Sequence, residues 1–126
     1  MSQSYMAPGL GDIGVMATGK STPAHVDGNG GNAIVALLNI PSAGVWVITA
    51  AGWLPISGKD GYAALLHNGL TLCGTDTGKY QFSMSGVLST ATATQVKLEY
   101  TNWDTAGHDN VQIPGMVFKA VKVGLL

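Results

Sequence analysis

The chain has 126 residues, enough for one hydrophobic core and too few for a second. Apolar residues make up 46% of it and charged residues only 10%, well below the roughly one quarter usual for soluble globular proteins. Six lysines, no arginine and seven acidic residues give a net charge of -1. This balance excludes the basic surface that nucleic-acid binding needs.

Residues 1–30 are predicted to form an extended arm, because they contain six glycines and two prolines and show no sustained apolar period. They have neither the basic start nor the apolar core of a signal peptide. A segment of this composition becomes ordered only by docking on a partner. The side chains that could supply the contacts are Tyr5, Met6, Leu10, Ile13, Val15 and Met16.

Two nucleotide-binding patterns occur in this arm. "GVMATGKS" (14–21) fits the phosphate-loop template, and "GLGDIG" (9–14) fits the dinucleotide template. Both templates need a strand before the loop and a helix after it. Pro8 precedes the patterns, and Pro23 with the following glycines comes directly after them. We therefore attribute both matches to glycine-rich composition, and expect Lys20→Ala to leave folding and assembly intact.

The uncharged stretch 28–58 is long enough to cross a membrane. A turn signal around Pro41 and Gly44 interrupts its centre, and β-branched residues dominate its second half. Two buried strands, 32–40 and 44–55, apolar on both faces, fit this pattern better than a span. We expect no association with a membrane.

The remaining chain also reads as strands separated by turns. Residues 62–74 split at Asn68-Gly69, a strong hairpin signal. Lys119 and Lys122 have opposite parity, which predicts a bulge or a partly solvated strand. The other predicted strands are 79–89, 94–103 and 115–126. Short strands with regular turns, and no helical period, predict an all-β antiparallel sandwich over residues 31–126. The strands from Asn32 onward are expected to contain the apolar core.

Four aromatic residues divide between core and surface. Trp46 and Trp53 are separated by an odd number of positions in one strand, so they lie on opposite faces of it. One of them is expected in the core. The alternative is that both are core residues. The other, with Tyr62 and Tyr100, is expected at a subunit contact, where large aromatic residues are enriched.

The segment "NWDTAGHDN" (102–110) is the richest polar cluster in the sequence. Aromatic faces flanked by carboxylates and amides suit sugars and polar epitopes, so this loop is either a receptor contact or an ordinary solvated loop. Its oxygen ligands could also hold calcium, but the ordered calcium-loop pattern is missing. The candidate receptor-binding residues are Trp103, Asp104, His108, Asp109 and Asn110.

Catalytic and metal-binding patterns are weak. His25, His67 and His108 lie in the arm, at a hairpin and in a loop, and no two have the spacing of metal ligands. Cys73 is the single cysteine, so the chain has no internal disulfide. We expect no enzymatic activity, cofactor or metal site. An enzyme whose site assembles across strands, such as a metal-dependent hydrolase or isomerase, stays open and is testable by metal analysis.

A resemblance covers roughly residues 32–126. The order "PSAGVWVITAAGWL", "ALLHNGLTL", "SGVLSTATATQVKLEYTNW" and "GMVFKAVKVGLL" resembles the jelly-roll domain of the complement globular-head and tumour-necrosis-factor-like superfamily. The family's Gly-Asp before its "V-x-L" strand is replaced by Ala93-Thr94-Gln95, and the stalk that often precedes the domain is absent.

The resemblance implies a jelly-roll sandwich that forms a homotrimer. Stalkless members rich in glycine and threonine are similar to small virion proteins of tailed phages. It therefore implies a non-enzymatic capsid decoration protein, assembled in the host cytoplasm, whose arm drapes over neighbouring subunits or the major capsid protein. The alternative is a receptor-binding fibre tip that recognises a host-surface glycan or protein through residues 102–110.

Overall fold

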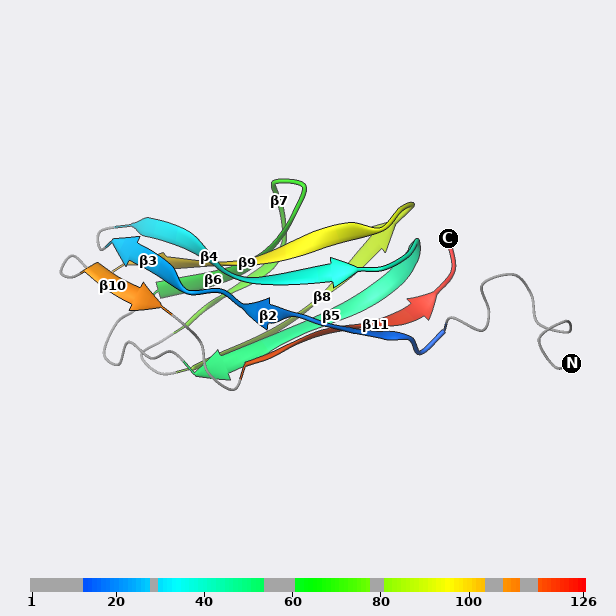
Figure 1. The fold of residues 1–126 in the computed structure, drawn as a ribbon, viewed down its shortest axis with the longest axis horizontal. Helices are drawn as coiled ribbons and strands as arrows, with labels where there is room; N and C mark the ends of the chain where they lie inside the picture. The colour runs from blue at the N-terminus through cyan, green and yellow to red at the C-terminus, as the bar shows by residue number, and fades with distance from the viewer. Residues whose placement is uncertain (1–12, 28–29, 54–60, 78–80, 104–107, 112–115) are drawn as a thin grey trace, which may run out of the picture.

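The computed structural model describes residues 13–27, 30–53, 61–77, 81–103, 108–111 and 116–126. Within these residues every regular element is a β-strand, and two antiparallel sheets face each other across a common core (Figure 1). The predicted all-β sandwich is confirmed. None of the described segments forms a helix with the length and apolar character needed to cross a bilayer.

Three sets of paired strands build the fold. The four-stranded sheet has the order β1 (Met16–Thr18), β11 (Val117–Gly124), β5 (Gly44–Trp53) and β8 (Gln81–Thr90). The five-stranded sheet has the order β2 (Lys20–Ser21), β4 (Gly31–Ile40), β9 (Thr94–Asn102), β6 (Gly61–His67) and β7 (Leu70–Asp76). A short ribbon pairs β10 (His108–Val111) with β3 (Ala24–Asp27).

The connections are those of a jelly roll. From β4 to β5, β5 to β6, β7 to β8 and β8 to β9, the chain passes from one sheet to the other. Sheets joined in this way form a double-sheet sandwich of crossing connections instead of a meander. The predicted jelly-roll architecture is therefore confirmed.

The β6–β7 hairpin turns at the predicted dipeptide. Asn68 has a φ of 51° and Gly69 a φ of 79°, the pair of positive values that a two-residue type I′ turn requires. The strand segments predicted from Asn32 onward are also present, each within a few residues of its expected ends.

The core lies between the inner faces of the two sheets. Trp46 and Ile48 of β5 project from one sheet, and Leu38 and Leu98 from the other, all fully buried. The indole Nε1 of Trp46 donates to the Ser42 carbonyl at 3.1 Å, so its one polar atom is satisfied inside the core. Trp53 is 63% exposed, which confirms that the two tryptophans face opposite ways.

The N-terminal segment from Met16 onward is part of the sandwich. β1 pairs with β11, and β2 pairs with β4, so the chain crosses between the sheets at Gly19. The Gly19 amide donates to the Phe118 carbonyl at 2.6 Å, and a Cβ at Gly19 would lie 2.5 Å from the Phe118 ring. "GVMATGKS" is therefore extended strand on both sides of this crossing, and no helix follows it in the described residues.

The core also extends beyond its predicted start at Asn32. Val26, in β3, is fully buried and belongs to the main hydrophobic cluster. The prediction that residues from Asn32 onward contain the whole core is therefore wrong. The reason is that β3 has only four residues, too few to show a period of its own, and pairs with the equally short β10, which is far away in the sequence.

Lys122 is buried, with 3% of its surface exposed, whereas Lys119 is exposed. The Lys122 Nζ donates to the Ser42 hydroxyl at 3.4 Å. β11 does carry an irregularity, but it lies between Lys122 and Gly124. No bulge separates the two lysines. Lys119 points outward, and Lys122 points inward with Phe118 and Ala120.

Candidate functional site

An apolar row crosses the outer face of the four-stranded sheet. Strand register places Met16 of β1 opposite Val121 of β11, Val121 opposite Val47 of β5, and Val47 opposite Val87 of β8. We call these four residues the apolar row. Met16 is 58% exposed and Val87 is 61% exposed, at its two ends. The row therefore presents one apolar side chain from each strand of the sheet to solvent.

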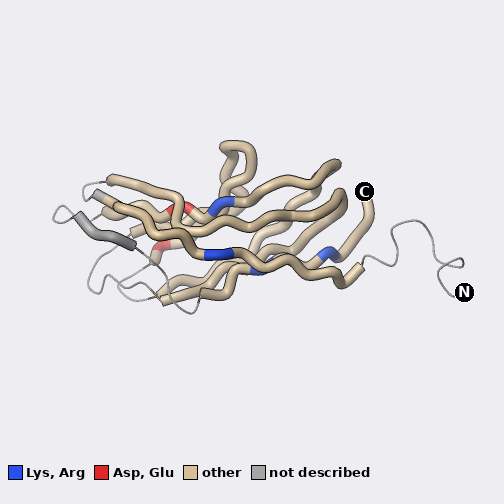
Figure 2. The backbone as a smooth tube through the Cα atoms, viewed as in Figure 1, with Lys and Arg blue, Asp and Glu red and all other residues tan. Residues whose placement is uncertain are grey.

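The surroundings of the apolar row carry little charge. The next row consists of Thr18, Lys119, Thr49 and Ser85, again one residue from each strand. Among the described residues that point outward from this sheet, Lys119 alone is charged. Figure 2 shows how sparse charged residues are along the described chain as a whole.

The outer face of the five-stranded sheet is polar in contrast. Its outward residues include the charged side chains of Lys20, Lys97, Glu99 and Asp76. Gln95 donates through its side-chain nitrogen to the Asn39 side-chain oxygen at 3.1 Å, which links β9 to β4 on this face. Charged and amide side chains are therefore more frequent on this face than on the outer face of the four-stranded sheet.

Trp103, from the predicted receptor loop, stacks on Tyr62. The ring centroids are 5.7 Å apart, the planes differ by 21°, and Trp103 remains 50% exposed. The Tyr62 ring lies against Gly74 of β7, where a side chain would collide with it. The structure thus places Trp103 at the surface with its ring stacked on Tyr62.

The rest of the predicted loop divides into two parts. Asp104 lies outside the described residues. His108, Asp109 and Asn110 belong to β10, where they pair with Asp27, Val26 and His25 of β3. The prediction that His108 lies in a loop is therefore wrong, because a strand partner was present in the N-terminal segment. The pairing of β10 with β3 in the two-stranded ribbon fixes the backbone of these three residues.

Tyr100 is not available for a subunit contact, contrary to prediction. It is 1% exposed within the chain itself, since it shares the inward parity of Val96 and Leu98 in β9. A Cβ at Gly61 would lie 2.6 Å from its ring, so the phenol packs directly over that glycine. Tyr62 is only half-buried and keeps one face for Trp103.

The structure describes three of the six arm residues that are predicted to bind a partner. Tyr5, Met6 and Leu10 lie outside the described residues. The exposed fractions are 41% for Ile13, 39% for Val15 and 58% for Met16. The Val15 carbonyl accepts from the Lys122 amide at 3.0 Å, and the Gly14 amide donates to the Lys122 carbonyl at 2.8 Å. These bonds fix the start of the described chain beside β11, next to the apolar row.

Titratable groups are scattered. Among the described residues, no three His, Cys, Asp or Glu side chains come close enough together to hold a metal ion. Cys73 is half-buried in β7, and its burial raises the pKa of the thiol above its ordinary value. His25 lies in β3 and His67 ends β6.

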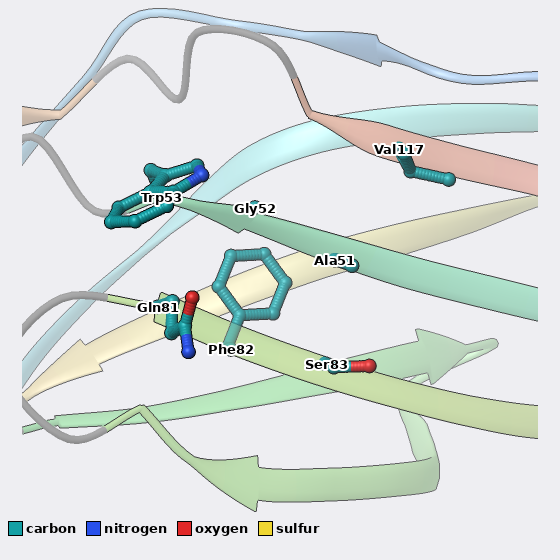
Figure 3. A pocket seen from close by; sticks show the side chains of 7 residues that line it. All are labelled: Ala51, Gly52, Trp53, Gln81, Phe82, Ser83 and Val117. Carbon is teal, nitrogen blue, oxygen red and sulfur yellow. The ribbon is translucent and has the colours of Figure 1, made fainter.

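One site was missed by the sequence analysis. At the end of β5, Trp53 lies opposite Gln81 of β8, and Ala51 lies opposite Ser83. Together with Gly52, Phe82 and Val117 they line a surface hollow of about 450 Å³ (Figure 3). The sequence predicted one of Trp46 and Trp53 at a surface without saying which, and it offered no signal for the partners of Trp53, because the pairing of β5 with β8 sets them.

Comparison with known proteins gives likeness of fold only. No protein-family model matches the sequence, and no curated protein matches it. One similar solved structure is that of infectious bursal disease virus Gt strain, with 14% sequence identity and a TM-score of 0.46 over 85% of this chain and 32% of that one. Another is the VP2 subviral particle of infectious bursal disease virus, with 15% identity and a TM-score of 0.45 over 86% of this chain and 30% of that one. A third is the acetyl xylan esterase Est2A from the rumen bacterium Butyrivibrio proteoclasticus, with 16% identity and a TM-score of 0.33 over 95% of this chain and 30% of that one. The chain spans about a third of the length of these proteins.

Proposed function

We propose that this protein is a non-enzymatic structural protein of a tailed-phage virion, a homotrimer that decorates the capsid surface. The observation that carries the proposal is the apolar row on a chain with only 10% charged residues. The trimeric state and the phage particle come from the resemblance to the complement globular-head and tumour-necrosis-factor-like superfamily, whose stalkless members resemble small phage virion proteins.

The apolar row supports self-association because contiguous apolar surface on a monomer favours burial against a partner. Val87 lies on β8, an edge strand of its sheet, and Met16 lies on β1, the opposite edge. The row therefore runs across the full width of the sheet, where a second subunit could cover it. One lysine, Lys119, borders it, so little charge would need to lose its water on docking.

The arm supplies the proposed link to the major capsid protein. Ile13 and Val15 are exposed where the described chain begins, and hydrogen bonds of Gly14 and Val15 to Lys122 hold this segment beside β11 (Figure 1). An arm that orders only on docking loses about 1–2 kcal/mol of backbone entropy per fixed residue, so it must gain many contacts from its partner. The apolar side chains Tyr5, Met6 and Leu10 are suited to provide them.

The test compares the full chain with a variant that begins at Ile13. A cut at residue 30 would also remove β1, β2 and buried Val26, so its failure would not be informative. We expect both proteins to form trimers by sedimentation velocity, with similar thermal midpoints. Only the full chain should cosediment with empty capsids. A monomeric full chain, or equal capsid binding by both proteins, would overturn the proposal.

The second candidate function is a receptor-binding tip. It is favoured by the stacking of half-exposed Trp103 on Tyr62 at the protein surface. If it is correct, Trp103→Ala should abolish adhesion to host cells while leaving the trimer intact. If the decoration role is correct, the same variant should bind capsids as well as the parent does.

A further inference from the structure

We infer that the hollow beside Trp53 binds a neutral saccharide. Two features of the hollow define it: an indole ring that is 63% exposed, and exposed polar side chains on the neighbouring strand. Trp53 and Gln81 are cross-strand partners, so their side chains project from the same face of the sheet at the same level (Figure 3). An aromatic plane and an amide are thus held side by side on regular strands.

The chemistry of the lining selects the class of ligand. None of the seven described lining residues is charged, so these side chains offer no counter-ion for an anion or a cation. The Gln81 amide and the Ser83 hydroxyl can both donate and accept hydrogen bonds, as sugar hydroxyls do. The face of an indole ring carries partial negative charge and attracts the weakly positive C–H groups on the flat side of a pyranose.

The apolar part of the lining supports the same ligand. Val117 is 44% exposed and lies opposite Ala51 in register, next to the Ala51–Ser83 pair. Gly52 adds no side chain to the wall, and the hollow therefore stays open beside Trp53. A shallow site with one aromatic platform, one apolar side and a polar rim suits one or two sugar rings lying on the surface.

The hollow shares the outer face of the four-stranded sheet with the apolar row, but it lies at the other end of β5. Trp53 is six residues along β5 from Val47, a distance of about 20 Å at roughly 3.3 Å per residue. Tyr62 lies on β6 of the five-stranded sheet and Trp103 directly follows β9 of the same sheet, on the other side of the sandwich. Saccharide binding here therefore does not depend on self-association through the apolar row, and either proposal can fail alone.

In the experiment, the full chain is titrated separately with maltotriose, cellotriose and chitotriose. Binding is measured by calorimetry and by the shifts of the indole N–H signals in NMR spectra. We expect at least one of the three to bind saturably at millimolar concentration and to shift the Trp53 indole signal. Trp53→Ala should weaken binding at least tenfold, because it removes the platform. Gln81→Leu should weaken saccharide binding about fivefold, because the hydrogen bonds of the Gln81 side-chain amide to the sugar are lost.

Trp103→Ala is the matched control, since it removes an exposed indole from the other sheet and should leave saccharide affinity unchanged. If Trp53→Ala does not fold, Gln81→Leu and the wild-type indole shift carry the test. The inference is overturned if none of the three sugars binds saturably, if Gln81→Leu and Trp53→Ala bind as the parent does, or if Trp103 shifts in place of Trp53.

Discussion

The two outer faces of the sandwich differ although the strands that form them alternate in the same way. Across the four-stranded sheet, Met16, Val121, Val47 and Val87 form one apolar row. Across the five-stranded sheet, the row Lys20, Leu37, Lys97 and Leu66 mixes charged and apolar residues. Both inner faces are apolar, so the core alone does not distinguish the sheets. The difference lies in the side chains that each outer face exposes, and the proposed self-association therefore uses the four-stranded side.

The largest effect is expected from a charge placed in the apolar row. Val87→Lys should weaken self-association at least 100-fold, about 2.7 kcal/mol, because an ammonium group would lose its water in the interface without a partner. Sedimentation velocity over a concentration series measures this. The matched control is Leu70→Lys, at a residue 72% exposed on β7 of the other sheet. Equal weakening by both variants would remove the distinction between the faces.

A substitution at the crossing between the sheets should lower stability without changing either face. Gly19→Ala would place a Cβ 2.5 Å from the Phe118 ring and 2.9 Å from the Leu37 carbonyl oxygen. Since Phe118 is buried and Leu37 O is backbone, we expect a loss of about 1–3 kcal/mol in the free energy of unfolding, measured in urea. Gly14→Ala is not a clean control because Gly14 has a φ of 91°, so Lys20→Ala serves instead. A neutral Gly19→Ala would show that β1 and β2 do not hold the sheets together.

Cys73 reports on the side of the sandwich where β7, an edge strand of the five-stranded sheet, packs near β8, an edge strand of the four-stranded sheet. Because burial favours the neutral thiol, the pKa of Cys73 is raised, and iodoacetamide should react with it several-fold more slowly at pH 8 than with the urea-unfolded chain. The raised pKa contributes stability that is present below the thiol's unfolded-state pKa. That contribution is lost as pH rises through the folded-state pKa, because the unfolded chain ionises first. Equal alkylation rates for folded and unfolded protein would contradict this.

The smallest expected effect is that of salt. If the trimer forms through the apolar row, its association constant should change less than about twofold between low and moderate sodium chloride, since screening acts only on charged groups. An interface on the five-stranded face, with Lys20, Lys97 and Glu99, should respond more strongly. A steep salt dependence would therefore move the interface to that face.

Much of this architecture follows from local pattern. The long strands β4, β5, β8 and β9 show their apolar periods directly, and Asn68-Gly69 identifies its own turn because it supplies two positive φ values. The opposite faces of Trp46 and Trp53 follow from parity alone. These features depend only on residues close together in the sequence.

What the sequence did not reveal depends on distant partners. β1 and β2 have three and two residues, too few for a period, and they exist because β11 and β4 offer free edges. Lys122 reads as a surface residue until Ser42, 80 positions away, is placed beside it. The Trp53 hollow and the Trp103–Tyr62 stack likewise arise from strand register, which a single sequence does not specify.

The crossing at Gly19 also determines how the molecule bears a load. A pull applied at Ile13 meets first the hydrogen bonds of Gly14 and Val15 to Lys122, and then β1, which pairs with β11 of one sheet. Beyond Gly19 the same pull is carried by Lys20 and Ser21, which pair with β4 of the other sheet. A load applied to the N-terminus would thus be carried by both layers of the sandwich, so it would strain the two sheets together instead of peeling one from the other.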